Sequence, residues 1–119
     1  MSERFRILVC GGRDFADADF VNDTLDRVLK KHPYMFLIHG AARGADTLAA
    51  EWADSRRVPA KAYPAEWGKF GNHAGPIRNQ QMIDDGKPDA VVAFPGGAGT
   101  ADMVERAKGH WLPVWEVAP

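Results

Sequence analysis

A glycine-rich segment, Pro95-Gly96-Gly97-Ala98-Gly99-Thr100, has the residue types and spacing of an anion-binding turn. It follows a short apolar run and opens an amphipathic segment, which predicts a strand, a tight turn and a helix. Because glycine has no Cβ atom, an outside group can approach the backbone N–H groups of such a turn closely. The first N–H groups of a helix lack intrahelical acceptors and carry positive potential. The segment therefore predicts a phosphate or carboxylate site, the alternative being a turn that only reverses the chain.

Three other turns of the chain combine small residues with an arginine. Arg13 follows two glycines, Arg43 precedes Gly44, and Arg78 follows Gly75-Pro76. A guanidinium group binds phosphate or ribose oxygen atoms through two parallel hydrogen bonds, and Arg78 is the first candidate for this role. The predicted ligand-binding residues of the four turns are Gly11, Gly12, Arg13, Asp14, His39, Gly40, Arg43, Gly44, Asp46, Gly75, Arg78, Asn79, Pro95, Gly96, Gly97, Gly99 and Thr100.

Short apolar runs alternate with amphipathic segments along the chain. Strands are expected at 5–10, 34–38, 59–63, 89–94 and 112–117, and helices at 17–31, 46–53, 76–85 and 100–108, with an irregular loop at 64–74. Strands that alternate with helices pair in parallel through right-handed crossovers. The pattern predicts an α/β fold, a Rossmann-like doubly wound parallel sheet of five strands in the order 3-2-1-4-5 with helices on both faces. In such sheets ligands bind beyond the carboxyl ends of the strands, so the four turns should line one crevice.

Length and composition limit the classes of function. The 119 residues suit a single domain spanning 1–119. The formal net charge of −1 argues against a nucleic-acid partner, because the basic residues are scattered among nearly equal numbers of acids. The single cysteine, Cys10, excludes an intramolecular disulfide and is expected to be a small buried hydrophobe, which fits a cytoplasmic location. We find no secretory signal and no apolar run long enough to span a membrane.

Several common kinds of site do not match the sequence. The Gly-x-x-x-x-Gly-Lys-Ser/Thr motif and the Gly-x-Gly-x-x-Gly motif of dinucleotide-binding proteins are both absent. The histidines, at positions 32, 39, 73 and 110, do not have metal-ligand spacing, and the sequence has no nucleophile elbow. We therefore expect neither a metal ion nor a bound cofactor.

The glycine-rich segment resembles the Pro-Gly-Gly-x-Gly-Thr signature of the lysine-decarboxylase-like proteins, which are grouped with the cytokinin-activating phosphoribohydrolases in the SLOG superfamily. The whole chain resembles more specifically the small YspA/YpsA-related SLOG family, through Gly11 to Phe15, His39 to Asp46 and Ala74 to Asn79. Ala42 to Asp46 and Arg78-Asn79 are also similar to the Rossmann-like domain of the DNA-processing protein DprA. The resemblance implies a SLOG-type domain that binds a small-molecule nucleotide or nucleotide-derived ligand. Some relatives hydrolyse the N-glycosidic bond of a nucleoside monophosphate, and the resemblance also implies this activity.

The resemblance to the hydrolases is incomplete at one position. Their signature continues Gly-Gly-x-Gly-Thr-x-x-Glu, and the glutamate pairs with an arginine of the preceding helix. This chain has Arg78 at the place of the arginine but Met103 at the place of the glutamate. Cleavage of the bond develops positive charge on the ribose, and a methionine cannot stabilise that charge.

Other carboxylates could take over the role of the missing glutamate. Asp102 and Glu105 lie nearby in the sequence, but a shift of one residue along a helix turns a side chain by about 100°, usually out of the crevice. Asp14 and Asp46 are expected to be better placed, because both belong to the turns. The candidate catalytic residues are Arg78, Asp14 and Asp102.

Three interpretations of the function stay open at this point, and they leave open whether the chain is an enzyme. They are a nucleotide-binding sensor or effector domain, a nucleoside monophosphate N-glycoside hydrolase, and a nucleic-acid-binding module. Met103 favours the first over the second, and the net charge disfavours the third. Four aromatic residues, Trp67, Phe70, Trp111 and Trp115, predict a homodimer, as is usual among the proteins that the chain resembles; the alternative is that they fill the core.

Overall fold

The computed structural model describes residues 3–119 and confirms the expected α/β architecture. Within those residues, five strands form one parallel sheet in the order β3-β2-β1-β4-β5. They are β1 (Phe5–Cys10), β2 (Met35–His39), β3 (Ala60–Ala62), β4 (Ala90–Ala93) and β5 (Val114–Glu116). The chain moves outward from β1 on one side and returns to β4 on the other, so the strand order reverses between β1 and β4, as in doubly wound folds.

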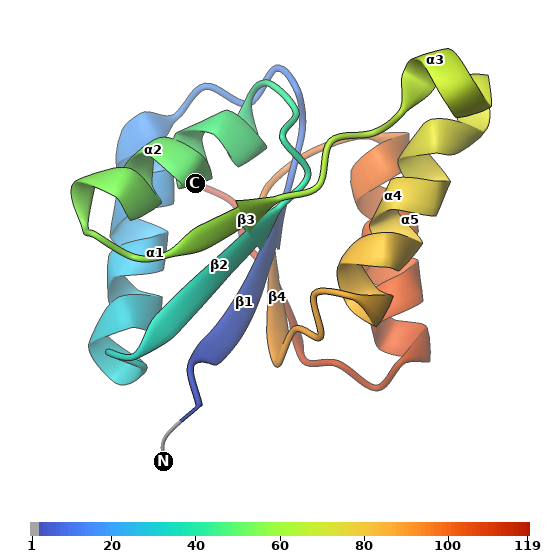
Figure 1. Cartoon of the computed structure of the whole chain (residues 1–119). Coiled ribbons are helices and arrows are strands. Elements are labelled where there is room, and N and C mark those ends of the chain that lie inside the picture. The colour runs from blue at the N-terminus through green and yellow to red at the C-terminus, as the bar shows by residue number, and fades with distance from the viewer. Residues whose placement is uncertain (1–2) are drawn as a thin grey trace.

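Two pairs of helices cover the two faces of the sheet (Figure 1). The first pair is α1 (Ala18–Lys31) and α2 (Ala45–Ser55), and the second is α4 (Ala74–Asp84) and α5 (Ala98–Gly109). The side chains of β1 alternate between the pairs: Ile7 and Val9 pack with α1 and α2, and Leu8 and Cys10 pack with α4 and α5. Because residues 7–10 of this central strand are buried on both faces, they appear in the sequence as an uninterrupted apolar run.

The segment 64–74 differs from the irregular loop that was expected. It contains the short helix α3 (Trp67–Phe70) and the 3₁₀ turn η1 (Gly71–His73), and α4 follows at once. A helix of four residues that includes a glycine is too short to show apolar periodicity in the sequence. In Figure 1, α3 projects above α4 at the end of the molecule where the strands terminate, so this segment lies on the carboxyl side of the sheet.

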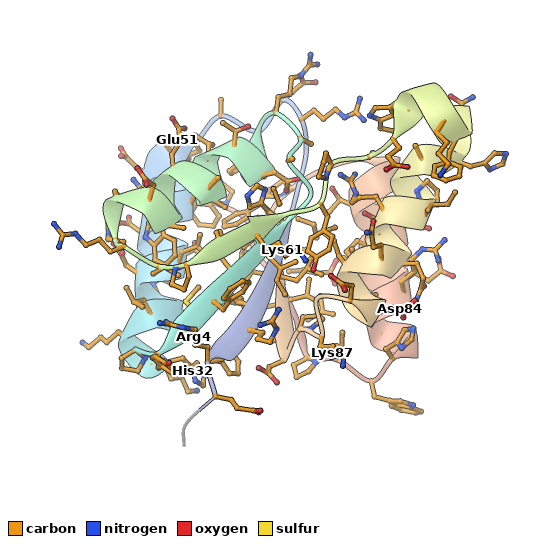
Figure 2. All side chains as sticks on the ribbon, viewed as in Figure 1. Arg4, His32, Glu51, Lys61, Asp84 and Lys87 are labelled. Carbon is orange, nitrogen blue, oxygen red and sulfur yellow. The ribbon has the colours of Figure 1, made fainter. Side chains whose placement is uncertain are left out.

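Local sequence signals mark the starts of two helices, as expected. The Asp17 carboxylate accepts a hydrogen bond of 3.0 Å from the N–H of Phe20 and caps α1, while Pro76 lies in the first turn of α4. Most charged side chains lie on the outer sides of the layers, as Glu51 on α2 shows in Figure 2, and Asp46 is a buried exception. No helix among residues 3–119 is both long and apolar enough to cross a lipid bilayer.

Three of the four aromatic residues singled out above lie at the surface. The side chains of Trp67, Trp111 and Trp115 are 46%, 93% and 43% exposed. The alternative interpretation, in which these aromatic residues fill the core, is therefore wrong for the three tryptophans. The tryptophan that does fill the core is Trp52 of α2, which is 1% exposed.

Candidate functional site

The loops that follow β1, β2 and β4 meet at the point where the strand order reverses. The N–H of Gly12 donates to the carbonyl oxygen of Pro95 at 2.8 Å, and the N–H of Ala45 donates to the carbonyl oxygen of Gly12 at 3.1 Å. A Cβ atom on Gly12 would come within 2.9 Å of the Pro95 carbonyl oxygen, so this close approach needs a glycine. The expected adjacency of the Gly11 and Pro95 turns is therefore confirmed.

A cleft of about 500 Å³ opens beside this junction, between the loops and the first turns of α4 and α5. Such a volume is in the range of small-molecule sites. The predicted site residues that line the cleft are Gly11, Gly12, Arg13, Asp46, Gly75, Arg78, Asn79, Gly97, Gly99, Thr100 and Asp102. A second pocket of about 400 Å³ adjoins the cleft, since Arg13, Ala42, Trp67 and Arg78 line both. This second pocket takes in Gly40 and Arg43 as well.

Five predicted site residues lie outside the linings of the cleft and the second pocket: Asp14, His39, Gly44, Pro95 and Gly96. Four of them shape the loops. Gly44 has φ +80° and lies against the backbone of Gly12, Pro95 accepts the hydrogen bond from Gly12, and Gly96 lies against Thr100. His39 is 8% exposed, its Nδ1 accepts a hydrogen bond of 3.0 Å from the N–H of Ala41, and burial lowers its pKa.

Asp14 takes part in a surface ion pair instead. Its carboxylate lies 3.2 Å from the Arg43 guanidinium, and the two side chains are 95% and 75% exposed. The structure therefore does not bring the Asp14 carboxylate into the cleft, where it was expected to assist chemistry. The turn after β1 directs Arg13 toward the cleft and leaves the next residue at the surface.

The first turn of α5 forms one wall of the cleft. Gly97 occupies the N-cap position and no side chain caps the helix. A Cβ atom on either Gly97 or Gly99 would meet no protein atom within 4 Å, and neither residue has a positive φ. These two glycines therefore leave the amide groups at the start of α5 open to the cleft without any demand from the packing of the chain.

Asp46 is a buried carboxylate at the inner end of the cleft, with 6% exposure. Its Oδ2 accepts hydrogen bonds of 3.2 Å from the N–H groups of Gly40 and Ala42, so the carboxylate holds the loop after β2 in place. Burial raises the pKa of Asp46 to about 6, although the Ala42 amide, the positive charge of Arg78 and the Gly40 amide act in the opposite direction. Asp46 thus titrates close to neutrality and is able to exchange a proton there.

Arg78 lies in α4 and reaches across to the loop after β2. Its Nη1 donates to the carbonyl oxygen of Gly40 at 2.5 Å and to that of Tyr63 at 3.5 Å, and its Nε donates to Oδ1 of Asn79 at 3.1 Å. Burial lowers the pKa of Arg78, and the nearby Asp46 carboxylate opposes that shift. The structural alternative to ligand binding was a salt bridge; the structure instead shows bonds to backbone carbonyl groups, so Arg78 joins the loops while it lines the cleft.

Asp102 lines the cleft, contrary to the expectation that helix rotation would turn it away. Its Oδ2 accepts hydrogen bonds from Nδ2 of Asn79 at 3.0 Å and from Nε of Arg106 at 2.8 Å. Burial acts to raise the pKa of Asp102, but these bonds from Arg106 and Asn79 bring it below its usual range. Met103 is buried in the core together with Val104. Met103 therefore faces the core, whereas Asp102, the residue before it, faces the cleft.

Trp67 is the main lining residue that sequence reasoning did not assign to the site. It begins α3, and its ring lies with its centroid 5.1 Å from the guanidinium carbon of Arg13. Trp67 also packs beside Gly75, where an added Cβ atom would come within 3.4 Å of the ring. The sequence offered one signal for this role, an aromatic residue in a loop that follows a strand. The prediction of a homodimer assigned that residue to a dimer interface instead. The other lining residues not predicted are Cys10, Ala42, Asn72, Pro76, Met82 and Ala98.

Two buried apolar side chains, Cys10 and Met82, also line the cleft. Cys10 lies there at the end of β1 and is 7% exposed, as expected for a small buried hydrophobe. Burial raises the pKa of its thiol to about 12, and the charges of Asp46 and Glu116 act in the same direction, so the thiol stays protonated. Among residues 3–119, no group of three or more histidine, cysteine, aspartate or glutamate side chains is arranged to hold a metal ion.

Comparisons with known proteins agree with this architecture. Residues 5–70, which contain the first two turns and reach Trp67, match the family described as the YspA, cpYpsA-related SLOG family. The chain is also similar to the Gene 61 protein of Mycobacterium phage D29, with 36% identity over 117 residues that cover 92% of this chain and 93% of that protein. On these grounds the chain belongs to the YspA, cpYpsA-related SLOG family.

Proposed function

We propose that the cleft binds a nucleotide or a nucleotide-derived ligand, with a phosphoryl group at the amide groups that begin α5. The observation that carries this proposal is the pair of open glycines, Gly97 and Gly99. At each of them a side chain would meet no other part of the protein, so the packing of the chain does not require a glycine there. Because both glycines line the cleft, we infer that the space accommodates a bound ligand. The guanidinium groups of Arg13 and Arg78 line the same cleft and supply further donors for an anion.

The family and the fold support the same ligand class. Ligands of doubly wound sheets bind at the point of strand reversal, and the cleft lies there. Membership of a SLOG family is consistent with a nucleotide-related ligand. The role that fits this arrangement is that of a sensor or effector domain, in which binding itself is the event.

The test is Gly99→Ala, because this change separates binding from folding. Alanine is the better helix former, so the substitution should leave stability the same or raise it, while the new methyl group occupies ligand space. We expect the affinity for a nucleotide, found by calorimetric screening of nucleoside mono-, di- and cyclic phosphates and dinucleotides, to fall by about tenfold or more, the effect of losing a hydrogen bond to a charged group.

A matched control is Gly109→Ala at the other end of the same helix. An added Cβ atom there also meets nothing within 4 Å, and Gly109 is not among the residues that line the cleft. Affinity should be unchanged in this variant. Unchanged affinity in Gly99→Ala, or an equal loss in both variants, would contradict the phosphate site at α5.

A second candidate function is hydrolysis of the N-glycosidic bond of a nucleoside monophosphate. The observation that favours it is that Asp102 and Asp46 both line the cleft. Two carboxylates are therefore present, although Met103 replaces the glutamate of the hydrolase signature. The carboxylate of Asp102 would stabilise the positive charge that develops on the ribose, and Asp46, with its pKa raised to about 6, would exchange a proton with water or the leaving base.

Chromatography of the reaction mixture tests this activity directly. We expect release of free base and ribose phosphate from at least one nucleoside monophosphate, and loss of at least 100-fold in kcat for Asp102→Asn, which keeps an acceptor for Asn79 but removes the charge. If the protein binds nucleotides without releasing free base, hydrolysis is contradicted and the sensor or effector role is retained.

Self-association as a homodimer stays a prediction, supported by the 93% exposure of Trp111 and the 43% exposure of Trp115. Light scattering at micromolar concentration should give the mass of a dimer, and Trp111→Ser should lower it. A monomer mass for the unchanged chain would contradict this prediction.

A further inference from the structure

The second pocket has a charge that distinguishes it from the cleft. Arg13, Arg43 and Arg78 all line it, and its lining contains no carboxylate. The cleft, in contrast, is lined by Asp46 and Asp102 as well as by two of these arginines. In a chain of net charge −1, three arginines around one pocket of about 400 Å³ form a local concentration of positive charge that matches an anion.

The charges of two of these arginines, Arg13 and Arg43, are only weakly satisfied by the protein. Arg13 stacks on Trp67 and makes no hydrogen bond or ion pair with another side chain in the described part of the chain. Arg43 pairs with Asp14, but both partners are more than 70% exposed, so the pair is screened by water and easily exchanged for a phosphate. Arg13 and Arg78 are close enough that the charge of the first helps to lower the pKa of the second. A bound anion would relieve this repulsion.

The junction between the two pockets is suited to the uncharged part of a nucleotide. Arg13 and Trp67 line both pockets, and the indole ring is 46% exposed. An aromatic face of this kind stacks on a nucleobase, and an arginine beside it adds donors for ribose or phosphate oxygen atoms. A single ligand can therefore extend from the start of α5, past Trp67, to Arg43.

We propose that the ligand carries phosphoryl groups at two separated positions, one at the start of α5 and the other in the second pocket beside Arg43, with its nucleoside part at Trp67. This inference rests on the proposed nucleotide site and assigns it a substrate class: nucleoside bisphosphates and oligonucleotide-like ligands, in preference to nucleoside 5′-monophosphates. Phosphate is the chemistry that arginines recognise best, because two N–H groups of one guanidinium bond two oxygen atoms at once.

The experiment compares three probes for each of the four common ribonucleosides by calorimetry: the 5′-monophosphate, the 5′-diphosphate and the 3′,5′-bisphosphate. We expect the 3′,5′-bisphosphate of the preferred nucleoside to bind about tenfold or more tightly than its 5′-monophosphate, the gain of one charge-assisted contact. The 5′-diphosphate, whose added group stays next to the first, should gain less. Arg43→Gln should lower the affinity for the bisphosphate by more than the affinity for the monophosphate, and so remove the gain of the bisphosphate.

A matched control is Arg57→Gln, which removes the same charge just beyond the opposite end of α2. It should alter none of the affinities. The inference is overturned if the bisphosphate and monophosphate bind equally, if the diphosphate gains as much as the bisphosphate, or if Arg43→Gln leaves the gain intact or weakens both ligands alike. In each of these cases nucleotide binding itself survives. The absence of binding by every probe overturns this inference, and the absence of binding by the cyclic nucleotides and dinucleotides of the calorimetric screen as well would overturn the proposed function.

Discussion

Apart from Gly75, where an added Cβ atom would lie in ordinary contact with Trp67, the glycines around the cleft fall into two groups, which differ in what such an atom would meet. Gly11, Gly12, Gly40, Gly44 and Gly96 all lie closer than 3.0 Å to other parts of the chain at that point. Gly97 and Gly99 lie a few residues away and meet nothing within 4 Å. The first group is needed to bring the loops together, and the second leaves space that the protein itself does not use. Structural and functional glycines are thus separable here by what surrounds them.

The largest expected effect comes from the first group. Gly44 has φ +80°, and a Cβ atom there would press on the backbone oxygen atoms of Gly12 and Arg13. Gly44→Ala should therefore lower the free energy of unfolding by about 4 kcal/mol, the sum of a strained backbone and a steric clash. Chemical denaturation measures the loss. Gly71→Ala is the control, because Gly71 has a backbone like that of Gly44, with φ +55° and ψ −133°, but lies in open space, and should lose only the backbone part, about 2 kcal/mol. Equal losses would erase the distinction.

The second expected effect concerns Asp46, which lies beside Gly40 and Arg78. Its pKa is about 6 in the folded chain and about 4 when unfolded, so between these values the folded state holds a proton that the unfolded state has released. This group's contribution to stability is therefore lost as the pH rises from about 4 to about 6, by roughly 3 kcal/mol in total. Asp46→Asn keeps an acceptor for the Gly40 and Ala42 amides and should be more stable than the unchanged chain above pH 6.

Denaturation curves of the two proteins from pH 4 to pH 8 test this directly. The difference between them isolates Asp46 from carboxylates such as Asp26 and Asp85, whose hydrogen-bonded partners lower their pKa values and give the opposite slope at acid pH. A difference that does not change with pH would show that Asp46 titrates normally.

The smallest expected effect is a gain in stability from a substitution in the second group of glycines. Gly99→Ala should raise the free energy of unfolding by about 0.5 to 1 kcal/mol, since Gly99 lies within α5 and alanine loses less entropy there. The same variant is expected to bind nucleotide less tightly, as argued above. A loss of stability would show that the fold needs Gly99, as it needs the first group of glycines, and would contradict the role of Gly99 in ligand binding.

Much of the fold could be predicted from the sequence because the pattern left few arrangements to choose from. Uninterrupted apolar runs such as residues 7–10 and Ala90–Ala93 indicate strands buried on both faces, and the helices between them require parallel pairing. That combination leads to the observed strand order. Strand ends were less well predicted, because a strand such as Ala60–Ala62 ends where its pairing ends and not where apolar residues end.

The contents of the cleft were predicted less completely, for reasons that particular residues make clear. Asp102 was expected to turn away, but Met103, Val104 and Ala107 form the buried stripe of α5, and the residue before such a stripe faces the cleft. That stripe was readable in the sequence. Trp67 was not assignable, because its place depends on how the chain from 64 to 74 crosses the edge of the sheet, which no periodicity encodes. Asp14 was assigned by its neighbours, and only the turn geometry shows that it points to Arg43.

The four tryptophans occupy environments so different that the chain carries its own optical readout. Trp52 is 1% exposed in the core, Trp111 is 93% exposed, and Trp67 and Trp115 are intermediate at 46% and 43%, of which only Trp67 lines the cleft. Emission from Trp52 should therefore be blue-shifted and shielded, and that from Trp111 red-shifted and readily quenched by iodide. A nucleobase that stacks on Trp67 should quench the Trp67 part of the intermediate emission and leave the part from Trp115 unchanged. Replacing Trp111 by phenylalanine would remove most of the solvent-exposed background and turn intrinsic fluorescence into a label-free titration of the site.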